Sequence, residues 1–507
     1  MTTAIVFWRS LSYQVASLPN GASFKPSDCW FGHDNSIRIE CGYMTTRASD
    51  SSSATFELPV VVLRYSWWKN SKSPMLHLAG GPGGAAYLDS EVMPFWIQNF
   101  IDQNWGVDFV LYDQRGAGLS KPPLRCPNTH AQRLDGLQLP LTAGEDGEHF
   151  SEQMQSCYDY LKEKKSLAGH LRLINTDYSV DDIADLHDLL GVEQWVLMGV
   201  SYGTRLALEV VRRHPEHVSS MVLDSVYPPE FDGFETLAEN SLNGIERLVE
   251  NCDIDEVCNE QFPMLSEQFY QALMALSKKP LPLTVPREIP DKPARPMLLT
   301  AHRLVLLLDY ASYDARILAD IPAAIFAVLE EEPSNRSLLK LASNYLEMEL
   351  FDDFSEPVFM ITECKENGRF DLAKLMQRLQ PYRGQYPMLD WSEKAVFDPN
   401  LCSPWKTLSQ PKSRNYREPV KSDIPTLILA GALDSVTPPE WGRSAAQQLT
   451  NSSYLEYPTA AHSVLTSSIC SNDEVQLFLN PSLKKTAFCN KKERIHQRTQ
   501  SVLAWTY

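Results

Sequence analysis

A serine stands between two glycines in the segment GVSYGT, residues 199–204. The apolar run QWVLM precedes it, and a stretch with helical spacing, TRLALEVVRRHP, follows it. A GxSxG pattern at a strand-to-helix turn presents the serine hydroxyl at the carboxyl edge of a sheet. The helix that follows would direct its dipole and free N–H groups towards charge that develops there. This context predicts that Ser201 is a nucleophile, although GxSxG alone also arises by chance.

A serine nucleophile needs a base, and the base needs a third group that orients it. Asp434 follows the apolar run IPTLILAGAL, and His462 lies in the loop after the next strand candidate. In enzymes with this serine turn, the acid and then the histidine follow in that order. We therefore predict that Asp434 and His462 complete a triad with Ser201. Asp224 is the rival acid, and its structural alternative is a strand-end residue that hydrogen-bonds to a loop.

Glycines cluster in HLAGGPGG, residues 77–84, after another strand candidate. Glycine lets the backbone approach a substrate, and a tetrahedral intermediate needs two N–H groups to hold its oxyanion. We predict that Gly81 and Tyr202, the residue after the nucleophile, supply them. The loop lacks the GKS or GKT ending of a P-loop and the context of a dinucleotide-binding GxGxxG, so a plain tight turn is the remaining alternative.

Strand and helix candidates alternate around these residues, which predicts a mostly parallel sheet covered on both faces. From about residue 230 to 420 the pattern becomes largely helical, and six prolines at residues 280–296 argue against regular structure there. We predict an α/β core of residues 1–229 and 421–507, interrupted by a helical cap over residues 230–420. The strand candidates are residues 55–65, 73–81, 107–116, 194–201, 219–229, 424–434 and 453–462, with a helix over 178–191.

The composition narrows the class of protein. The 507 residues carry a formal net charge of −18, and the sequence pI is about 5.1. We find no basic stripe, which argues against nucleic-acid partners, because those require clustered lysine and arginine. No run of about 18 apolar residues is present, which argues against a membrane span.

The ten cysteines fall as neighbours along the chain. An even count with local spacing favours disulfides in an oxidising compartment, and reduced buried thiols are the alternative. No CxxC or HxxxH spacing occurs, so no metal site is predicted. The paired cysteines favour a periplasmic or secreted protein, whereas the weak leader MTTAIVFWRS leaves a cytoplasmic location open. The pairs are Cys29 with Cys41, Cys126 with Cys157, Cys252 with Cys258, Cys364 with Cys402, and Cys470 with Cys489.

Five motifs in order resemble those of α/β-hydrolase aminopeptidases: GGPGG, DQRGAGLS, GVSYGT, LDSVTPP and AAHSVL. The resemblance runs from about residue 27 to 490 and is closer to the tripeptidyl aminopeptidases, with their paired cysteines, than to the proline iminopeptidases. It implies an α/β-hydrolase fold with a helical cap and catalytic roles for Ser201, Asp434 and His462. Proline iminopeptidases show HGGPG and GxSWG, where this chain has Ala79 and Tyr202, so strict preference for proline is not predicted.

Two acidic residues of the cap, Glu363 and Glu366, flank Cys364 in the segment ITECKENGRF. The resemblance places Glu366 at the family's cysteine-x-acid position. A lid over a strand-edge serine admits chain ends, and a carboxylate in it can pair with a free α-ammonium. The alternative is a solvated acidic pair.

Together these features predict a serine exopeptidase that acts near the free N-terminus of peptides through an acyl-enzyme, without metal or cofactor. An esterase or general acyl hydrolase with the same triad is one alternative, and a non-catalytic binding protein on a hydrolase scaffold is another. The predicted partners are peptides with a free N-terminus, and neither nucleic acid nor membrane. The sequence does not predict the oligomeric state or the number of residues released.

Overall fold

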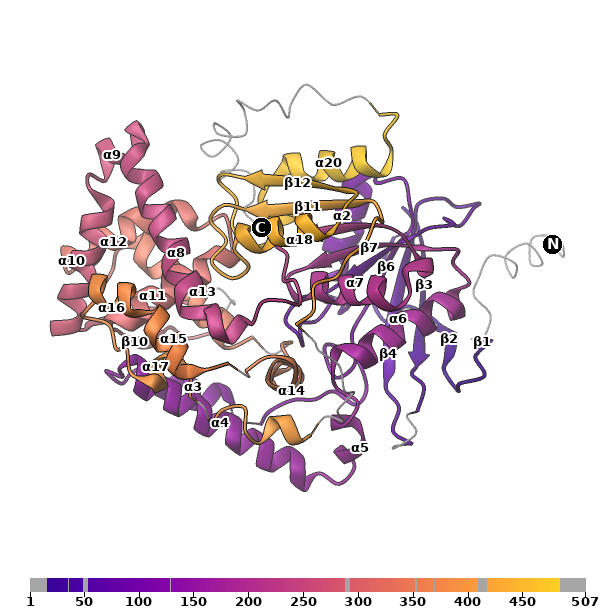
Figure 1. Ribbon diagram of the computed structural model, residues 1–507, viewed down its shortest axis with the longest axis horizontal. Coiled ribbons are helices and arrows are strands. Elements are labelled where there is room, and N and C mark those ends of the chain that lie inside the picture. Colours follow the sequence, from indigo (N-terminus) through magenta and orange to yellow (C-terminus); the bar gives the residue numbers. More distant parts are fainter. Residues whose placement is uncertain are drawn as a thin grey trace.

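A computed structural model gives the fold, and Figure 1 shows a sheet with its helices beside a mainly helical part. The leader sequence and Cys489, and with it the fifth predicted cysteine pair, lie outside the described residues. The described residues are 16–34, 36–48, 53–127, 129–287, 292–351, 353–368, 370–398, 400–408 and 417–483.

Within the described residues, ten strands form one central sheet in the order β1-β2-β3-β4-β6-β5-β7-β8-β11-β12. The four pairings from β1 to β6 are antiparallel. The five pairings from β6 to β12 are parallel, which confirms the predicted mostly parallel sheet. The strands are β1 (Ala16–Ser17), β2 (Ser23–Ser27), β3 (Arg38–Thr45), β4 (Glu57–Arg64), β5 (Met75–Leu78), β6 (Phe109–Tyr112), β7 (Trp195–Val200), β8 (Val218–Asp224), β11 (Thr426–Gly431) and β12 (Ser452–Tyr457).

Helices cover both faces of the sheet, because successive side chains of each strand point to opposite sides. Val60 and Val62 of β4 pack in the apolar core under α6, α7 and α18. Val61 and Leu63 pack in the core under α2 and α20 on the other face. The covering helices are α2 (Met93–Gln103), α6 (Thr176–Leu190), α7 (Tyr202–Arg213), α18 (Pro439–Gln448) and α20 (Ile469–Leu479), and the 3-10 turn η1 (Pro215–His217) and the short α19 (Val464–Ser467) lie at loop ends.

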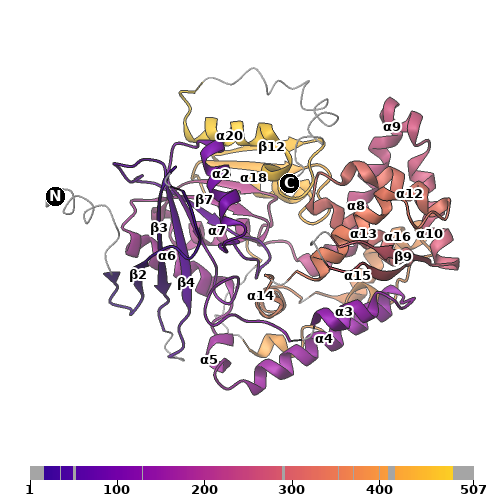
Figure 2. The same ribbon diagram turned by 180° about the vertical axis from the view of Figure 1, so that it is seen from behind.

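Between β8 and β11 the chain forms a mainly helical region with an apolar core of its own. Figure 2 shows this region beside the sheet from the opposite side. None of the described helices combines the length and the hydrophobicity needed to cross a lipid bilayer. The elements of the helical region are α8 (Gly233–Ile254), α9 (Glu256–Gln261), α10 (Leu265–Lys278), α11 (Ala301–Tyr310), η2 (Ala311–Tyr313), η3 (Leu318–Asp320), α12 (Ile321–Leu329), α13 (Arg336–Glu349), α14 (Glu356–Glu366), α15 (Leu372–Arg378), α16 (Gln380–Gln385), α17 (Glu393–Val396) and η4 (Trp405–Thr407).

A two-stranded hairpin occupies part of the proline-rich segment. β9 (Leu281–Val285) pairs antiparallel with β10 (Arg295–Leu299). Pro282 and Pro296 lie inside these strands. Each strand of a two-stranded sheet is an edge, so a residue without an N–H is tolerated where that group would face outward. The prediction that the prolines exclude regular structure was therefore wrong for these two stretches.

Three helices of the first half of the chain lie outside the layers of the sheet. In both views α4 runs along the lower edge of the helical region (Figures 1 and 2). Arg303 of α11 donates hydrogen bonds to the carbonyl oxygens of Gly136 and Leu137, at the end of α3. These contacts satisfy carbonyl groups that a helix end leaves free. The three helices are α3 (Thr129–Gly136), α4 (Ala143–Glu163) and α5 (Ala168–Leu171).

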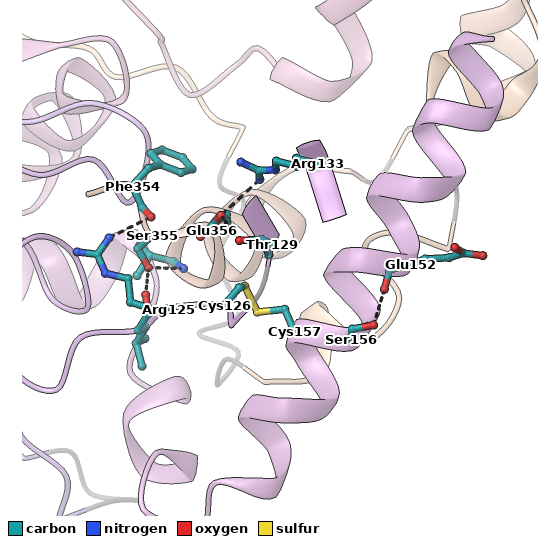
Figure 3. Close-up of a disulfide and its surroundings, with 12 residues drawn as sticks. Arg125, Cys126, Thr129, Arg133, Glu152, Ser156, Cys157, Phe354, Ser355 and Glu356 are labelled. Carbon is teal, nitrogen blue, oxygen red and sulfur yellow. Dashed lines mark hydrogen bonds and ion pairs between the residues drawn. A yellow bond between two sulfur atoms is a disulfide. The ribbon is translucent and has the colours of Figure 1, made fainter. Parts of the chain in front are cut away.

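Disulfides join four of the five cysteine pairs predicted from the sequence. Figure 3 shows the pair that ties the loop before α3 to helix α4. Close to it, the hydroxyl of Ser355, at the start of α14, donates to the carbonyl oxygen of Leu124 at 2.7 Å. The four pairs are Cys29–Cys41, Cys126–Cys157, Cys252–Cys258 and Cys364–Cys402.

Candidate active site

Ser201 lies at the turn between β7 and α7, at the carboxyl end of a central strand. Its backbone has a φ of 55° and a ψ of −124°, a strained conformation for a residue with a side chain. A Cβ at Gly203 would lie 1.9 Å from the carbonyl oxygen of Leu78, and one at Gly199 would lie 2.5 Å from Gly203 O. The local backbone is therefore a strand-to-helix elbow that requires glycine on both sides of the serine.

The glycine-rich loop after β5 lies directly against Ser201. A Cβ built on Gly80 would be 3.1 Å from Ser201 Cβ and 3.6 Å from Ser201 Oγ. Neither the N–H of Gly81 nor that of Tyr202 donates a hydrogen bond to another described residue. Tyr202 begins α7, where helical N–H groups have no intrahelical partner. The N–H groups of both predicted oxyanion donors are therefore without an acceptor among the described residues.

The start of α14 holds the same loop in place. The N–H of Ser355 donates to the carbonyl oxygen of Gly83 at 2.9 Å. Gly83 has a φ of +94°, and a Cβ there would lie 2.5 Å from Ser355 O. The helical region therefore contacts the backbone that carries Gly81.

His462 and Asp434 form a buried pair on the loops after β12 and β11. Nδ1 of His462 lies 3.1 Å from Oδ1 and 3.0 Å from Oδ2 of Asp434. The N–H groups of Val436 and Thr437 donate to Oδ1, and the Thr437 hydroxyl donates to Oδ2 at 2.8 Å. These bonds hold the carboxylate against Nδ1, which leaves Nε2 of the imidazole for proton transfer.

The charges around the pair favour a protonated histidine beside an ionised aspartate. Burial alone would raise the pKa of Asp434, but His462 and the hydrogen bonds from His462 and Thr437 outweigh it, so the pKa is lowered. Burial alone would lower the pKa of His462, but Asp434, and with it Asp224 and Asp309, raises it. An imidazole that accepts a proton readily is what a general base needs.

Asp224 connects the serine turn to the histidine loop. Its carbonyl oxygen accepts the N–H of Ser201 at 3.0 Å. Its carboxylate accepts the N–H groups of Val464 and Leu465, at 2.8 and 2.9 Å. The side chain of this rival acid is thus bonded to the first turn of α19, directly after the loop of His462. This link places Ser201 and His462 at one sheet edge, although no hydrogen bond joins the serine hydroxyl to the imidazole among the described residues.

Glu366 is buried on α14, with 6% of its surface exposed. Its two carboxylate oxygens accept the N–H and the hydroxyl of Thr176, both at 2.9 Å. The same hydroxyl shares a hydrogen bond of 2.7 Å with the Tyr202 hydroxyl. Burial raises the pKa of Glu366 to about 7, although Arg205 opposes the shift. Glu366 therefore belongs to a polar network that includes the side chain of Tyr202.

Glu363 lies in the same network, with 4% of its surface exposed. Its Oε2 accepts hydrogen bonds from Tyr227 at 3.1 Å and from Asn367 at 2.7 Å. Its Oε1 accepts none from any described residue. Burial raises its pKa, and Arg205 partly offsets that effect. The alternative of a solvated acidic pair is wrong, because both carboxylates are buried around one guanidinium.

No feature of the sequence predicts several of the contacts that hold the loops of Asp434 and His462. Arg247 of α8 donates to the carbonyl oxygen of Asp434 at 3.1 Å. The carbonyl oxygen of Ser312, in η2, accepts the N–H of His462 at 3.0 Å. The ring of Tyr313 meets the imidazole edge-on at 4.9 Å. Thr437, three residues after Asp434, is the one contact that its spacing from the acid could have suggested.

Histidines and carboxylates gather at the opposite, amino edge of the sheet, at the ends of α6 and α7. Among the described residues, two overlapping groups around His217 have ligand atoms within 4.8 Å of one another. The rings of His187 and His217 are stacked 3.9 Å apart at an angle of 3°. Lone pairs of parallel rings do not converge on one point, so this arrangement does not build a metal centre. The groups are His187, Asp188 and His217, and His214, Glu216 and His217.

Two protein-family models match the chain. Residues 74–292 match the family described as alpha/beta hydrolase fold. Residues 386–487 match the family described as TAP-like protein. The first match contains the serine turn, and the second contains the loops of Asp434 and His462. The resemblance inferred from the five motifs is confirmed.

Three curated proteins are similar to this chain at low identity. The putative hydrolase YuaR of Escherichia coli (strain K12) is 23% identical over 275 residues, 50% of this chain and 51% of that protein. Serine protease Hip1 of Mycobacterium tuberculosis (strain ATCC 25618 / H37Rv) is 21% identical over 373 residues, 71% of this chain and 69% of Hip1. The tripeptidyl aminopeptidase of Streptomyces coelicolor is 25% identical over 202 residues, 38% of this chain and 36% of that protein. The chain thus spans about half the length of YuaR.

Among solved structures, the alpha/beta hydrolase fold protein from Chitinophaga pinensis aligns with a TM-score of 0.36 and 10% identity. The alignment covers 86% of this chain and 97% of that one.

Proposed function

Because this chain belongs to the α/β-hydrolase family, we propose that it is a serine exopeptidase that hydrolyses amide bonds near the free N-terminus of peptides. The observation that carries the proposal is the buried pair of Asp434 and His462 at the sheet edge that also bears Ser201. The family description TAP-like protein and the peptidase names of two relatives support a peptidase.

In this mechanism Ser201 Oγ attacks the carbonyl carbon of the substrate while His462 Nε2 takes the hydroxyl proton. Asp434 orients the imidazole and stabilises its protonated form. The N–H groups of Gly81 and Tyr202 bind the oxyanion. His462 then delivers the proton to the leaving amine, and water, activated by the same histidine, releases the acyl group from the serine. An amide and an ester would both follow this route.

A free N-terminus would be recognised by the acidic pair of α14. The carboxyl groups of Glu363 and Glu366 lie around the one guanidinium of Arg205, and Oε1 of Glu363 accepts no hydrogen bond from a described residue. An α-ammonium would favour the ionised forms of both carboxyl groups and form charge-assisted hydrogen bonds with them. Of the two glutamates, Glu363 is the better placed, because Thr176 already occupies both oxygens of Glu366.

The test of the catalytic assignment is the substitution Ser201→Ala, with release of the leaving amine from an unblocked tripeptide amide as the assay. We expect turnover to fall about 10⁴-fold or more while the melting temperature stays within a few degrees. Turnover retained in a purified Ser201→Ala preparation would end the proposal.

Peptide length and blocking groups test the exopeptidase part separately. An N-acetylated peptide should be cleaved about 100-fold more slowly than the free peptide, because the acidic pair loses its cation. Glu363→Gln should reduce this ratio, whereas an ester substrate without an amine should be unaffected by the same change. Equal cleavage of free and acetylated peptides, together with ester hydrolysis, would favour a general acyl hydrolase.

A further inference from the structure

The end of α11 and the turn η2 bring residues 309–313, DYASY, from the helical region onto the histidine loop. The carbonyl oxygen of Ser312 accepts the N–H of His462 at 3.0 Å. The hydroxyl of Ser435, the residue after Asp434, donates to the Ser312 hydroxyl at 3.0 Å. The segment is therefore hydrogen-bonded to the loop of His462 and to the loop of Asp434.

Tyr313 fixes the plane of the imidazole. Its ring meets that of His462 at an interplanar angle of 63°, an edge-on contact. The edge of one aromatic ring against the face of another favours one orientation over rotation about the Cβ–Cγ bond. Tyr313 is 41% exposed, so this contact does not depend on deep burial of the tyrosine.

Asp309 places a third carboxylate near the imidazole. It is 8% exposed, and the hydroxyl groups of Ser435 and Ser241 hydrogen-bond to its carboxylate; burial raises its pKa, and these hydrogen bonds oppose that effect. Ser435 directly follows Asp434, so its contact with Asp309 brings this carboxylate to the loop of the candidate acid. The charge of Asp309 acts on His462 in the same direction as those of Asp434 and Asp224.

We propose that residues 309–313 are a positioning element of the catalytic histidine, in which Ser312 holds its backbone, Tyr313 holds the plane of its imidazole and Asp309 adds a third carboxylate beside the triad loops. This rests on the proposed function, because it assigns a purpose to the orientation and basicity of His462. On this proposal the helical region binds the catalytic histidine through direct contacts, in addition to covering the sheet edge.

The charged groups facing His462 come from three elements. Asp434 follows β11, Asp224 ends β8, and Asp309 lies on α11. The cation at this junction, Arg247 of α8, donates to the backbone carbonyl of Asp434. The contribution of Asp309 can therefore be removed alone, leaving the two other carboxylates and the guanidinium in place.

The test is a direct titration of His462 by NMR in protein labelled with ¹³C-histidine, with the signal assigned by loss in a His462→Gln variant. Asp309→Asn should lower the pKa of His462 by about 0.5–1 unit relative to the unmodified chain. Asp314→Asn removes the same charge five residues along, where the partner is Arg316, and should leave the pKa unchanged. Equal pKa values in the Asp309→Asn and Asp314→Asn variants would overturn the role of Asp309.

The titration needs no turnover, so it can be read even if the chain cleaves no peptide, and the two proposals fail separately. Where the chain does cleave peptides, Asp309→Asn should also move the acid limb of kcat/KM to lower pH, because that limb reports the protonated histidine.

If Asp309→Asn does not fold, two variants of Tyr313 test the positioning role of residues 309–313. Tyr313→Leu should lower kcat about tenfold with little change in KM, because the imidazole loses its fixed plane. Tyr313→Phe keeps the ring and should restore kcat. Identical kcat values in the Leu and Phe variants would contradict the positioning role.

Discussion

The sheet and the helical region both reach the candidate site, but they contribute different kinds of group. From the sheet come side chains at strand ends, Ser201, Asp434 and His462, which parallel strands bring to one edge. From the helical region come mostly backbone and packing contacts, such as the carbonyl oxygen of Ser312 on His462 and the N–H of Ser355 on Gly83. The comparison indicates that the topology of the sheet brings the proposed reacting groups to one edge and that the helical region contacts the loops that carry them.

We expect the largest effect when a substitution removes the negative charge of Asp434, the candidate acid at the end of a sheet strand. Asp434→Asn should lower kcat about 10⁴-fold, because the amide cannot hold the imidazole in the tautomer that leaves Nε2 free to accept a proton. Single-turnover kinetics on an activated ester would measure this loss.

The matched control is Asp224→Asn, which alters the neighbouring aspartate whose carboxylate holds the histidine loop. It should cost stability, about 1–3 kcal/mol, because an amide cannot accept both N–H groups of Val464 and Leu465 equally well. Its kcat should fall much less than that of Asp434→Asn. If Asp224→Asn were the more damaging to kcat, the assignment of the acid would have to be exchanged.

The next prediction compares the loss of stability when a glycine of each region is replaced by alanine. Gly203→Ala should destabilise the fold by about 3–5 kcal/mol, since the new Cβ would lie 1.9 Å from Leu78 O in the centre of the sheet. Gly384→Ala, in helix α16, meets nothing within 4 Å and should be neutral or stabilising by up to about 1 kcal/mol. Urea unfolding of both variants measures the difference, and similar losses would show that the serine turn is not unusually crowded.

Much of the parallel sheet could be predicted because its strands are long apolar runs that end in recognisable turns. The run QWVLM became β7, and TLILAG became β11. The antiparallel strands β2 and β3 had no such signal: SFKPS contains a proline and polar residues, and it is held by pairing with β3 instead of by its own propensity. The hairpin of β9 and β10 was missed for a related reason, since prolines are excluded from central strands but not from edges.

In the candidate site, the residues proposed to react could be named from the sequence, whereas the residues that contact their loops could not. Ser201, Asp434 and His462 follow strands in a known order, so one sequence is enough to propose them. Asp309 and Arg247 lie on helices whose apolar stripes dominate the pattern, and a polar residue there gives no local sign of what it faces. Only packing of the helical region on the triad loops brings them to the site.

Removing one disulfide from each region should have different effects on stability and on substrate binding. The disulfide Cys364–Cys402 ties the end of α14 to a residue 38 positions further along the chain, and Cys29–Cys41 spans 12 positions at the antiparallel edge. Replacing both cysteines by alanine should cost about 4 kcal/mol in the first case and about 3 kcal/mol in the second. Because α14 carries the acidic pair and contacts the glycine loop, the first double variant should also raise KM for free peptides, measured beside the unmodified chain. A raised KM in the second double variant would argue against a specific role of α14.

The smallest effect is a pH dependence of stability. The pKa of Glu366, raised by burial to about 7 from an ordinary 4.5, means that the folded chain binds more protons than the unfolded chain between those pH values. Its contribution to stability is thus fully present below pH 4.5 and is lost as the pH rises through 7. In that window the free energy of unfolding should fall by up to about 1.4 kcal/mol per pH unit from this group. Asp113, Asp182 and Asp224, each with a pKa raised to about 6 by burial, act in the same direction.

Glu366→Gln isolates the part of this slope that belongs to the helical region. Urea unfolding at pH 5, 6 and 7 should show a shallower decline in the variant than in the unmodified chain, while the decline due to the sheet carboxylates persists. Asp371→Asn, an exposed cap residue on α15, is the matched control and should keep the full slope. Activity should change in the opposite sense over the same range, because acid protonates His462 while it stabilises the fold. A slope unchanged by Glu366→Gln would mean that this carboxyl group is not protonated in the folded chain, and that the acidic pair carries its full negative charge against Arg205.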